Sequence, residues 1–153
     1  MNPARWKGHL DTVLPAAGTV ANAGHHSALP VGEIRAFMKT LRSQAGMSAQ
    51  ALEFTVLTAA RSGEVRGARW TEIDLDAATW TVPGERMKAG KEHRVPLSDA
   101  ALAILNALPQ EDRNALVFAS PRGGMLSDMS LTAVLRRMKV DAVPHGFRSS
   151  FRV

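Results

Sequence analysis

The spacing of apolar residues changes twice along this chain, and these changes constrain its fold more than any other feature. Between Pro30 and about Ala60, apolar side chains recur every three or four residues, as in amphipathic helices. From Trp70 to Leu97 they alternate with other residues, which is typical of strands, and after Ser98 the helical spacing returns. This order predicts an α+β domain that is mainly helical and contains a small three-stranded antiparallel sheet.

The helical stretches divide at recognisable start and stop residues. The first helix is expected over about Val31 to Arg42, and the second from Ser48, its N-cap, to about Ala60, where Ser62 and Gly63 interrupt it. The later helices are expected from Ser98 to Pro109 (Leu102, Leu105 and Leu108 on one face), from Ser127 or Asp128 onward (Leu131, Val134, Leu135 and Met138 on one face), and from Pro144 through His145, Phe147 and Arg148. The strands are expected around Ile73 and Leu75, around Trp80 and Val82, and over His93 to Leu97.

Residues 1–26 lack a sustained apolar period and contain Pro3, Pro15, Gly18 and Gly24, so most of them are expected to form a tail or linker. One folded domain is expected over residues 27–153, since a chain of 153 residues seldom divides into two cores. No apolar stretch reaches 18 residues and no signal-peptide pattern opens the chain, so we expect a cytoplasmic protein without a membrane span.

The residue types exclude several kinds of site. The chain has no cysteine, which excludes disulfide scaffolds, thiol catalysis and thiolate metal sites. His25 and His26 are adjacent, but neighbouring histidines do not converge on one ion without further ligands, so we expect no metal site.

Positive charge is concentrated in the second half of the chain. Nineteen Lys and Arg against 14 Asp and Glu give a net charge of +5. Residues 1–76 hold 8 basic and 7 acidic residues, whereas residues 77–153 hold 11 and 7. Arginine outnumbers lysine 14 to 5, which suits phosphate recognition because a guanidinium group grips two oxygens at once. A GC-rich genome would also raise the arginine content, so composition alone decides nothing.

One local pattern places Arg61 beside Glu64, with Gly63 between them. Taken alone, Arg61 is an ordinary cation at a helix C-terminus and Gly63 an ordinary C-cap residue.

Two further patterns are basic. The segment Arg86 to Arg94 is a predicted hairpin that contains Lys88 and Lys91, and taken alone it is a solvated turn. His145 and Arg148 stand at i and i+3, which on a helix places them on one face about 5 to 6 Å apart. Taken alone, they are a surface pair at a helix start.

In this order, the three patterns resemble the tyrosine recombinase or phage integrase family, specifically the integrases of satellite phages and genomic islands. The resemblance covers about Ser27 to Phe151 and depends on four segments: LTAARSGEVRGARW (Leu57–Trp70), EIDLD (Glu72–Asp76), VPLS (Val95–Ser98) and HGFR (His145–Arg148). Each segment is weak alone, and their shared order and spacing make the match strong. Asn2–Trp6 also looks like the end of the core-binding domain that precedes the catalytic domain in such integrases. Residues 1–26 are therefore interpreted as a remnant of that domain with a linker, and residues 27–153 as a truncated catalytic domain.

The resemblance implies DNA strand cleavage and rejoining without a metal or other cofactor. By this resemblance, Arg61 and Arg148 would clamp the phosphate and stabilise the charge that develops on its non-bridging oxygens. Lys88 would protonate the departing 5′ oxygen, and His145 would hydrogen-bond the phosphate or help to remove the nucleophile's proton. Glu64 is interpreted as a buttress that holds Arg61.

Several basic residues outside this set are expected to contact DNA: Lys91, which is also a second candidate for the proton donor, Arg94, Arg136 and Arg137. The expected partners are double-stranded DNA and full-length integrase protomers, with no membrane.

The sequence departs from the family at its nucleophile. Members carry, beyond the His-x-x-Arg box, a further His or Trp and then the tyrosine that joins the 3′ phosphate, whereas this chain has no tyrosine. Ser149 and Ser150 are not expected to replace it. We expect no nucleophile and no activity of the chain alone, and whether it is an enzyme stays open. Loss of the final helices is expected to expose apolar surface around Leu131, Leu135 and Phe147 and to leave the fold marginally stable.

Three hypotheses follow from these observations. The chain is a fragment of an integrase catalytic domain, or a non-catalytic DNA-binding module that interferes with a full-length integrase, or a phosphate pocket that an intact partner complements with its own tyrosine. The first two predict salt-dependent DNA binding, in which log affinity falls by roughly 0.9 per phosphate neutralised as log salt rises.

Overall fold

The computed structural model of the chain describes residues 27–150. The α-helices are α3 (Val31–Arg42), α4 (Met47–Thr58), α5 (Ser62–Arg66), α6 (Asp99–Asn106), α7 (Ser130–Arg137) and α8 (Phe147–Ser150). The strands are β1 (Ile73–Asp74), β2 (Thr79–Val82) and β3 (His93–Pro96), and the 3₁₀ helices are η2 (Trp70–Glu72), η3 (Gly84–Arg86) and η4 (Pro144–Gly146). The expected linker and core-binding remnant over residues 1–26, with the His25–His26 doublet, lie outside the described residues.

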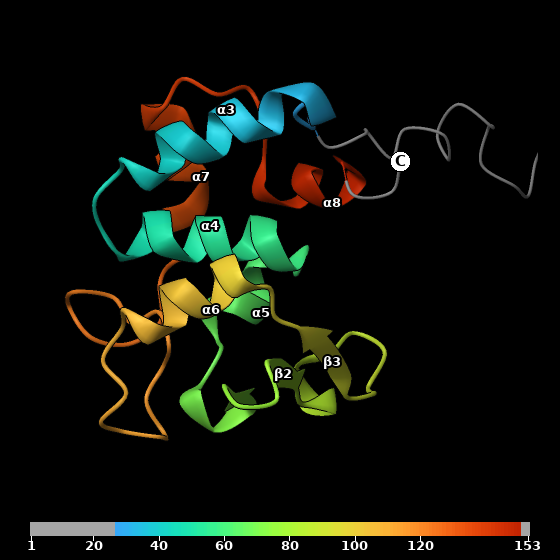
Figure 1. Ribbon diagram of the computed structural model, residues 1–153, viewed down its shortest axis with the longest axis vertical. Coiled ribbons are helices and arrows are strands. Elements are labelled where there is room, and N and C mark those ends of the chain that lie inside the picture. The colour runs from blue at the N-terminus through green and yellow to red at the C-terminus, as the bar shows by residue number, and fades with distance from the viewer. Residues whose placement is uncertain (1–26, 151–153) are drawn as a thin grey trace, which may run out of the picture.

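Helix α4 lies at the centre of the fold because its sequence is apolar on nearly all sides. Ala51, Leu52, Phe54 and Val56 are all buried along it, and a helix that is hydrophobic all round is suited to a core. It contacts α3, α5, α6 and α7. In Figure 1, α3, α7 and α8 lie on one side of α4, whereas α5, α6 and the sheet lie on the other. Every other layer of the fold is therefore positioned against this helix.

The sheet has the strand order β1-β2-β3, with both neighbouring pairs antiparallel. Trp80 in the central strand pairs with Ile73 on one side and Val95 on the other, and all three side chains are buried. Alternation along β2 directs Trp80 and Val82 to the same buried face. The structure confirms the predicted α+β class, mainly helical with a three-stranded antiparallel sheet.

Three aromatic rings fasten the sheet to the central helix. The Phe54 ring of α4 lies 5.5 Å from the Trp80 ring of β2 and 5.3 Å from the Phe118 ring, measured between centroids. All three side chains are fully buried. Tilted aromatic pairs at these distances stabilise a core beyond their buried area. The hairpin that follows β2 is therefore anchored at its base.

The predicted helix from Val31 to Arg42 is confirmed, and a helix follows Ser98 as expected, with Ser98 as its N-cap. The boundaries of α4 differ from the prediction. The N-cap is Gly46, whose φ of 104° suits glycine, and not Ser48. The helix ends because Ala59 adopts a left-handed conformation, before Ser62 and Gly63 are reached. Those two residues begin α5, so they open a helix where an interruption was predicted, and Gly63 is not a C-cap.

The start of α7 and the first turn of the sheet region also differ. Helix α7 begins at Ser130 and not at Ser127 or Asp128, because the carbonyl of Ser127 accepts the N–H of Ser130 in a preceding turn. Trp70, predicted to open the strand region, lies in a 3₁₀ helix. The last predicted helix is split, since Pro144 starts η4 and α8 begins only at Phe147.

The expected exposure of apolar surface around Leu131, Leu135 and Phe147 is wrong. Leu131 and Leu135 are fully buried where α7 contacts α4. The Phe147 ring is buried too and stacks on Phe37 of α3, with the centroids 5.0 Å apart. The helices of the described chain thus cover these three residues themselves. None of the helices formed by residues 27–150 has the length and apolar character that a bilayer crossing requires.

Candidate functional site

Arg61 is held at the junction of α4 and α5 by one buried carboxylate. The backbone extends at Arg61 (φ −78°, ψ 145°), which makes it the N-cap of α5 and not a cation at a helix C-terminus. Glu64, only 6% exposed, accepts the backbone N–H of Arg61 at 3.0 Å and its guanidinium Nη1 at 2.9 Å. A negative charge in the first helical turn also offsets the positive end of the helix dipole. The Arg61 side chain stays 43% exposed, so it is fixed and still accessible.

The segment between β2 and β3, residues 83–92, forms a tight turn that we call the Lys88 hairpin. The N–H of Gly90 donates to the Met87 carbonyl at 2.9 Å, and Gly90 has a φ of 67°. Gly84, near the start of this segment, packs closely against Gly90, near its end. A Cβ on Gly84 would lie 2.7 Å from the Gly90 carbonyl oxygen. Met87 packs against the core while Lys88, next to it, is exposed. The turn thereby holds one side chain inward and leaves the ammonium group outside.

Arg148 lies on α8, the short helix that Phe147 anchors to α3 through its stacked contact with Phe37. Arg148 itself is half-buried. The preceding Gly146 is buried beneath the backbone of Ser27, and a Cβ on Gly146 would collide with the Ser27 carbonyl. The absence of a side chain at Gly146 therefore allows the two segments to meet.

The segment Ser27–Leu29 is tied to both ends of the region that carries Arg148. The Ser27 hydroxyl donates to the Asp141 carbonyl at 2.8 Å, and the Val143 N–H donates to the Ser27 carbonyl at 3.2 Å. The Ser150 hydroxyl donates to the Leu29 carbonyl at 2.9 Å. These bonds join residues more than a hundred positions apart, so the location of Arg148 depends on the start of the described chain.

A hollow of about 540 Å³ brings three of these elements together. Arg61, Lys88 and Arg148 all line it, each from a different segment. The C-terminal end of α4, the hairpin beside β3, and α8 lie on the same side of the molecule in Figure 1. Glu64 is the acidic residue in the lining, and its carboxylate is already engaged by Arg61. The hollow therefore presents a cluster of cations suited to an oxyanion.

The remaining predicted residues lie outside the lining of this hollow. His145 is in η4, exposed and directly before the segment that carries Arg148. The predicted DNA contacts are all exposed: Lys91 on the Lys88 hairpin, Arg94 on β3, where its Nε lies 3.2 Å from Glu92, and Arg136 and Arg137 in the last turn of α7. The structure thus brings together Arg61, Lys88 and Arg148, with Glu64 behind them, and spreads the other basic residues over the surface.

Two residues near the hollow were not predicted as functional. His93, the first residue of β3, lines the hollow, and it pairs across the sheet with Val82 at the base of the Lys88 hairpin. The sequence signal that could have identified His93 is its position at the start of the strand that closes a basic hairpin. Arg86 is the other residue, and its contacts connect regions that are distant in sequence. Among residues 27–150, no group of three His, Asp or Glu side chains is arranged to hold a metal ion.

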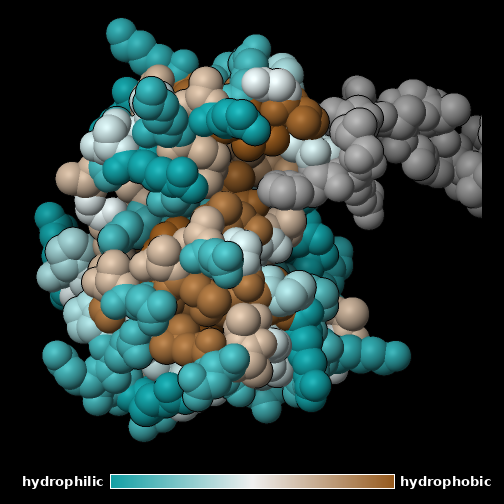
Figure 2. Space-filling model, viewed as in Figure 1, coloured by the Kyte–Doolittle hydropathy of each residue, from teal (hydrophilic) through white to brown (hydrophobic). Residues whose placement is uncertain are grey.

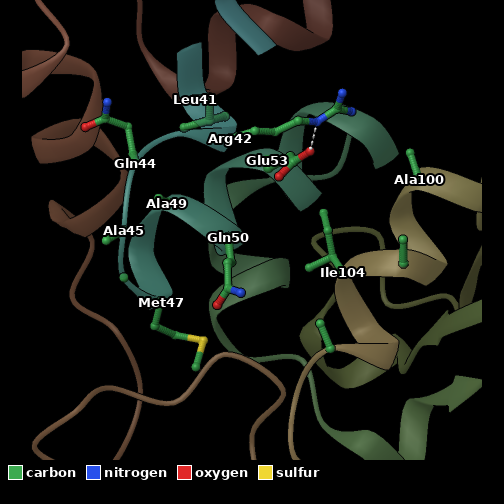
Figure 3. A pocket seen from close by; sticks show the side chains of 13 residues that line it. Leu41, Arg42, Gln44, Ala45, Met47, Ala49, Gln50, Glu53, Ala100 and Ile104 are labelled. Atoms are coloured by element: carbon green, nitrogen blue, oxygen red, sulfur yellow. Dashed lines mark hydrogen bonds and ion pairs between the residues drawn. The ribbon is translucent and has the colours of Figure 1, made fainter. Parts of the chain in front are cut away.

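A larger hollow of about 660 Å³ lies between the α3–α4 connection, α4 and α6. Figure 3 shows Met47, Gln50 and Ile104 around it, with Arg42 and Glu53 paired at its rim. Most of its lining is alanine or other apolar side chains, and Figure 2 shows apolar surface over α4 and α6 on this face. None of the predicted site residues lines it. The predicted residues Arg61, Glu64, Lys88 and Arg148 line only the smaller hollow.

Comparison with known proteins adds independent findings. The family model described as "Phage integrase family" matches residues 28–152. The chain is similar to the prophage integrase IntZ of Escherichia coli K12, with 37% identity over 93% of this chain, and to the integrase of Enterobacteria phage P4, with 32% identity over 91%. It spans 36% of the length of each of these relatives. Its fold is similar to that in a crystal structure of a lambda integrase tetramer bound to a Holliday junction, with a TM-score of 0.64, 21% identity, and coverage of 91% of this chain and 44% of the other.

Proposed function

Because this chain belongs to the phage integrase family, we propose that it binds the phosphate backbone of double-stranded DNA in the hollow lined by Arg61, Lys88 and Arg148. One observation carries the proposal: cations from three separate segments, Arg61, Lys88 and Arg148, line one space that holds a single acidic residue, Glu64, so its lining keeps a net positive charge. The DNA-bound state of the lambda integrase supports duplex DNA as the partner. The tetramer of that relative supports other integrase protomers as partners of this chain.

The residues of the hollow would divide the recognition of one phosphate between them. The two guanidinium groups, Arg61 and Arg148, would each donate to non-bridging oxygens, where charge grows during phosphoryl transfer. Lys88 is proposed as the proton donor to the departing 5′ oxygen, because a compact ammonium group on a turn can approach that atom. His145 is proposed to contact the same phosphate from η4. In this proposal, all charged groups that contact the phosphate are side chains of this chain, and no metal is used.

The 153 residues contain no tyrosine, so the proposal for this sequence covers phosphate binding and polarisation without strand cleavage. Ser150 does not supply a substitute, because its hydroxyl donates to the Leu29 carbonyl. We propose another integrase protomer as one source of the tyrosine that a covalent intermediate requires. A recombination assay that mixes this chain with an intact relative lacking its own arginine clamp tests this point, since only complementation restores product.

DNA binding itself is tested by fluorescence anisotropy with a labelled duplex over a series of salt concentrations. Affinity is expected to fall steeply with salt, and Arg61→Gln and Arg148→Gln are each expected to weaken binding about tenfold and to reduce the salt slope by about one. Arg42→Gln removes an arginine of the same charge at the rim of the other hollow and serves as the matched control. Equal losses in all three variants would show that binding follows net charge and not the hollow.

A further inference from the structure

Arg86, on the Lys88 hairpin, donates hydrogen bonds to two residues that are distant from it in sequence. Its Nη2 lies 2.6 Å from Glu72 Oε2, and its Nη1 donates to the backbone carbonyl of Glu64 at 3.2 Å. The same Glu64 holds Arg61 through its carboxylate. Arg86 itself stands two residues before Lys88. A series of contacts therefore runs from Arg61 through Glu64 to Arg86, which stands on the same hairpin as Lys88.

Glu72 is a firm anchor for this arginine. Its side chain is 7% exposed, and its Oε2 also accepts the indole Nε1–H of Trp80 at 3.0 Å. Trp80 is fully buried against Phe54, so the carboxylate is fixed to the most buried part of the sheet. The Arg86 side chain is 27% exposed, which leaves it much less screened than a surface pair. Such a pair is expected to hold the base of the hairpin in one place.

The space that Arg86 occupies depends on a neighbouring glycine. Gly67 ends α5, and a Cβ there would collide with Nη1 of Arg86 and lie 3.5 Å from its Cζ. The backbone of Gly67 has φ −93° and ψ 3°, and this negative φ is open to residues other than glycine. Glycine at this position is therefore explained by the passage of the guanidinium group, not by backbone conformation.

From these contacts we infer that Arg86 is a positioning residue, which sets the location of Lys88 relative to Arg61 without touching the bound phosphate. The inference rests on the proposed function, because it assigns Arg86 a role in the same phosphate site. Arg86 does not line the hollow, so a direct contact with the ligand is not part of its role. A guanidinium group suits the task, since its two terminal nitrogens donate to two acceptors in fixed directions.

The first test measures hydrogen exchange in the purified chain without DNA. In Arg86→Gln, the amides of Met87 and Gly90, which donate to carbonyls within the hairpin, are expected to exchange about tenfold faster, whereas those of α4 keep their protection. The matched control is Arg42→Gln, which removes an ion pair of the same 2.6 Å length at an exposed site. Unchanged exchange in the hairpin, or an equal rise in α4, would overturn the inference.

A second variant perturbs the guanidinium group while keeping every charge. Gly67→Ala places a methyl group against Arg86 and is expected to loosen residues 87–91 as Arg86→Gln does. Its control is Gly32→Ala, since a Cβ on Gly32 meets nothing within 4 Å. If Arg86→Gln does not fold, Gly67→Ala decides the question by itself. A hairpin that stays protected in Gly67→Ala would count against the inference.

The link to Lys88 is tested by a double-mutant cycle on duplex affinity. Lys88→Gln is expected to weaken binding about tenfold in the wild-type background but less than about threefold in the Arg86→Gln background, because Lys88 is already misplaced there. Equal losses in both backgrounds would show that Arg86 does not act through Lys88. A wild-type chain that fails to bind duplex DNA would refute the proposed function, while the exchange experiment would still decide whether Arg86 orders the hairpin.

Discussion

Arg61 and Lys88 face the same hollow, but the contacts that hold them reach over very different distances along the chain. Arg61 is fixed by Glu64, three residues away, through two bonds to one carboxylate. The Lys88 hairpin is fixed through Arg86, whose partners lie 14 and 22 residues away. A local motif can place a cation once a helix starts, whereas the hairpin depends on the packed sheet and on α5. The two sides of the hollow should therefore respond differently to mutation.

The largest effect on stability is expected at Phe54, because both sides of the hollow depend on the core packing around its ring. Phe54→Ala removes the ring that contacts Trp80 and Phe118, and it should lower the free energy of unfolding by about 3 to 5 kcal/mol. Urea denaturation measures this change. A loss below about 1 kcal/mol would mean that the sheet is not anchored through Phe54.

Removing the Glu64 carboxylate tests the local contact of Arg61 separately from the distant contacts of the Lys88 hairpin. Glu64→Ala leaves Arg61 without its partner and should lower the free energy of unfolding by about 1.5 to 3 kcal/mol, because hydrogen bonds to a charged group are lost. Glu53→Ala, which frees the exposed Arg42, is the control and should cost about 1 kcal/mol or less. Duplex affinity should fall only in Glu64→Ala. Equal effects of the two substitutions would show that the two bonds from Glu64 to Arg61 contribute no more than the single bond from Glu53 to Arg42.

The region that carries Arg148 should behave like the Lys88 hairpin, since it too depends on distant contacts. Gly146→Ala forces a methyl group against the Ser27 carbonyl and should lower the free energy of unfolding by about 1 to 3 kcal/mol. A thermal melt measures the loss, with Gly32→Ala as the uncrowded control. Equal melting temperatures for the two variants would show that Ser27 moves aside at little cost.

The smallest effect is expected at the end of α4. Ala59 has a φ of 51°, and glycine adopts this left-handed conformation without the steric cost of a side chain. Ala59→Gly should raise the free energy of unfolding by about 0.5 to 1 kcal/mol. Ala78→Gly, at a φ of 49° in the turn before β2, provides the comparison outside the hollow. A destabilising result at Ala59 alone would show that its methyl group supports the Arg61 side of the site.

Much of the fold could be predicted from the sequence because its signals are local. The alternation around Trp80 and Val82 gave the sheet, and the spacing of Ile34, Phe37, Met38 and Leu41 gave α3. The boundary at Ala59 could not be predicted, since nothing in an alanine announces a left-handed conformation. Ser62 and Gly63 favour a helix break by their residue types, but Glu64 supplies the capping carboxylate that lets them start a helix.

The residues of the candidate site also differ in how far the sequence could predict them. Arg61 and Glu64 are three residues apart, and the family resemblance predicted that Glu64 holds Arg61. The convergence of Arg61, Lys88 and Arg148 in one hollow followed from the family resemblance and not from periodicity. Arg86 could not be found in this way, because its acceptors, Glu72 and the Glu64 carbonyl, become its neighbours only after the sheet folds back on α5.

The central claim is that Arg61 and Arg148 bind the same phosphate of a DNA duplex. The most direct measurement follows the Nε–Hε signals of the arginine side chains by NMR while a short duplex is added, with Arg42 as the internal reference. The signals of Arg61 and Arg148 are predicted to shift with the same titration midpoint, while the signal of Arg42 does not shift. Different midpoints for the two arginines, or an equal shift of Arg42, would contradict the account.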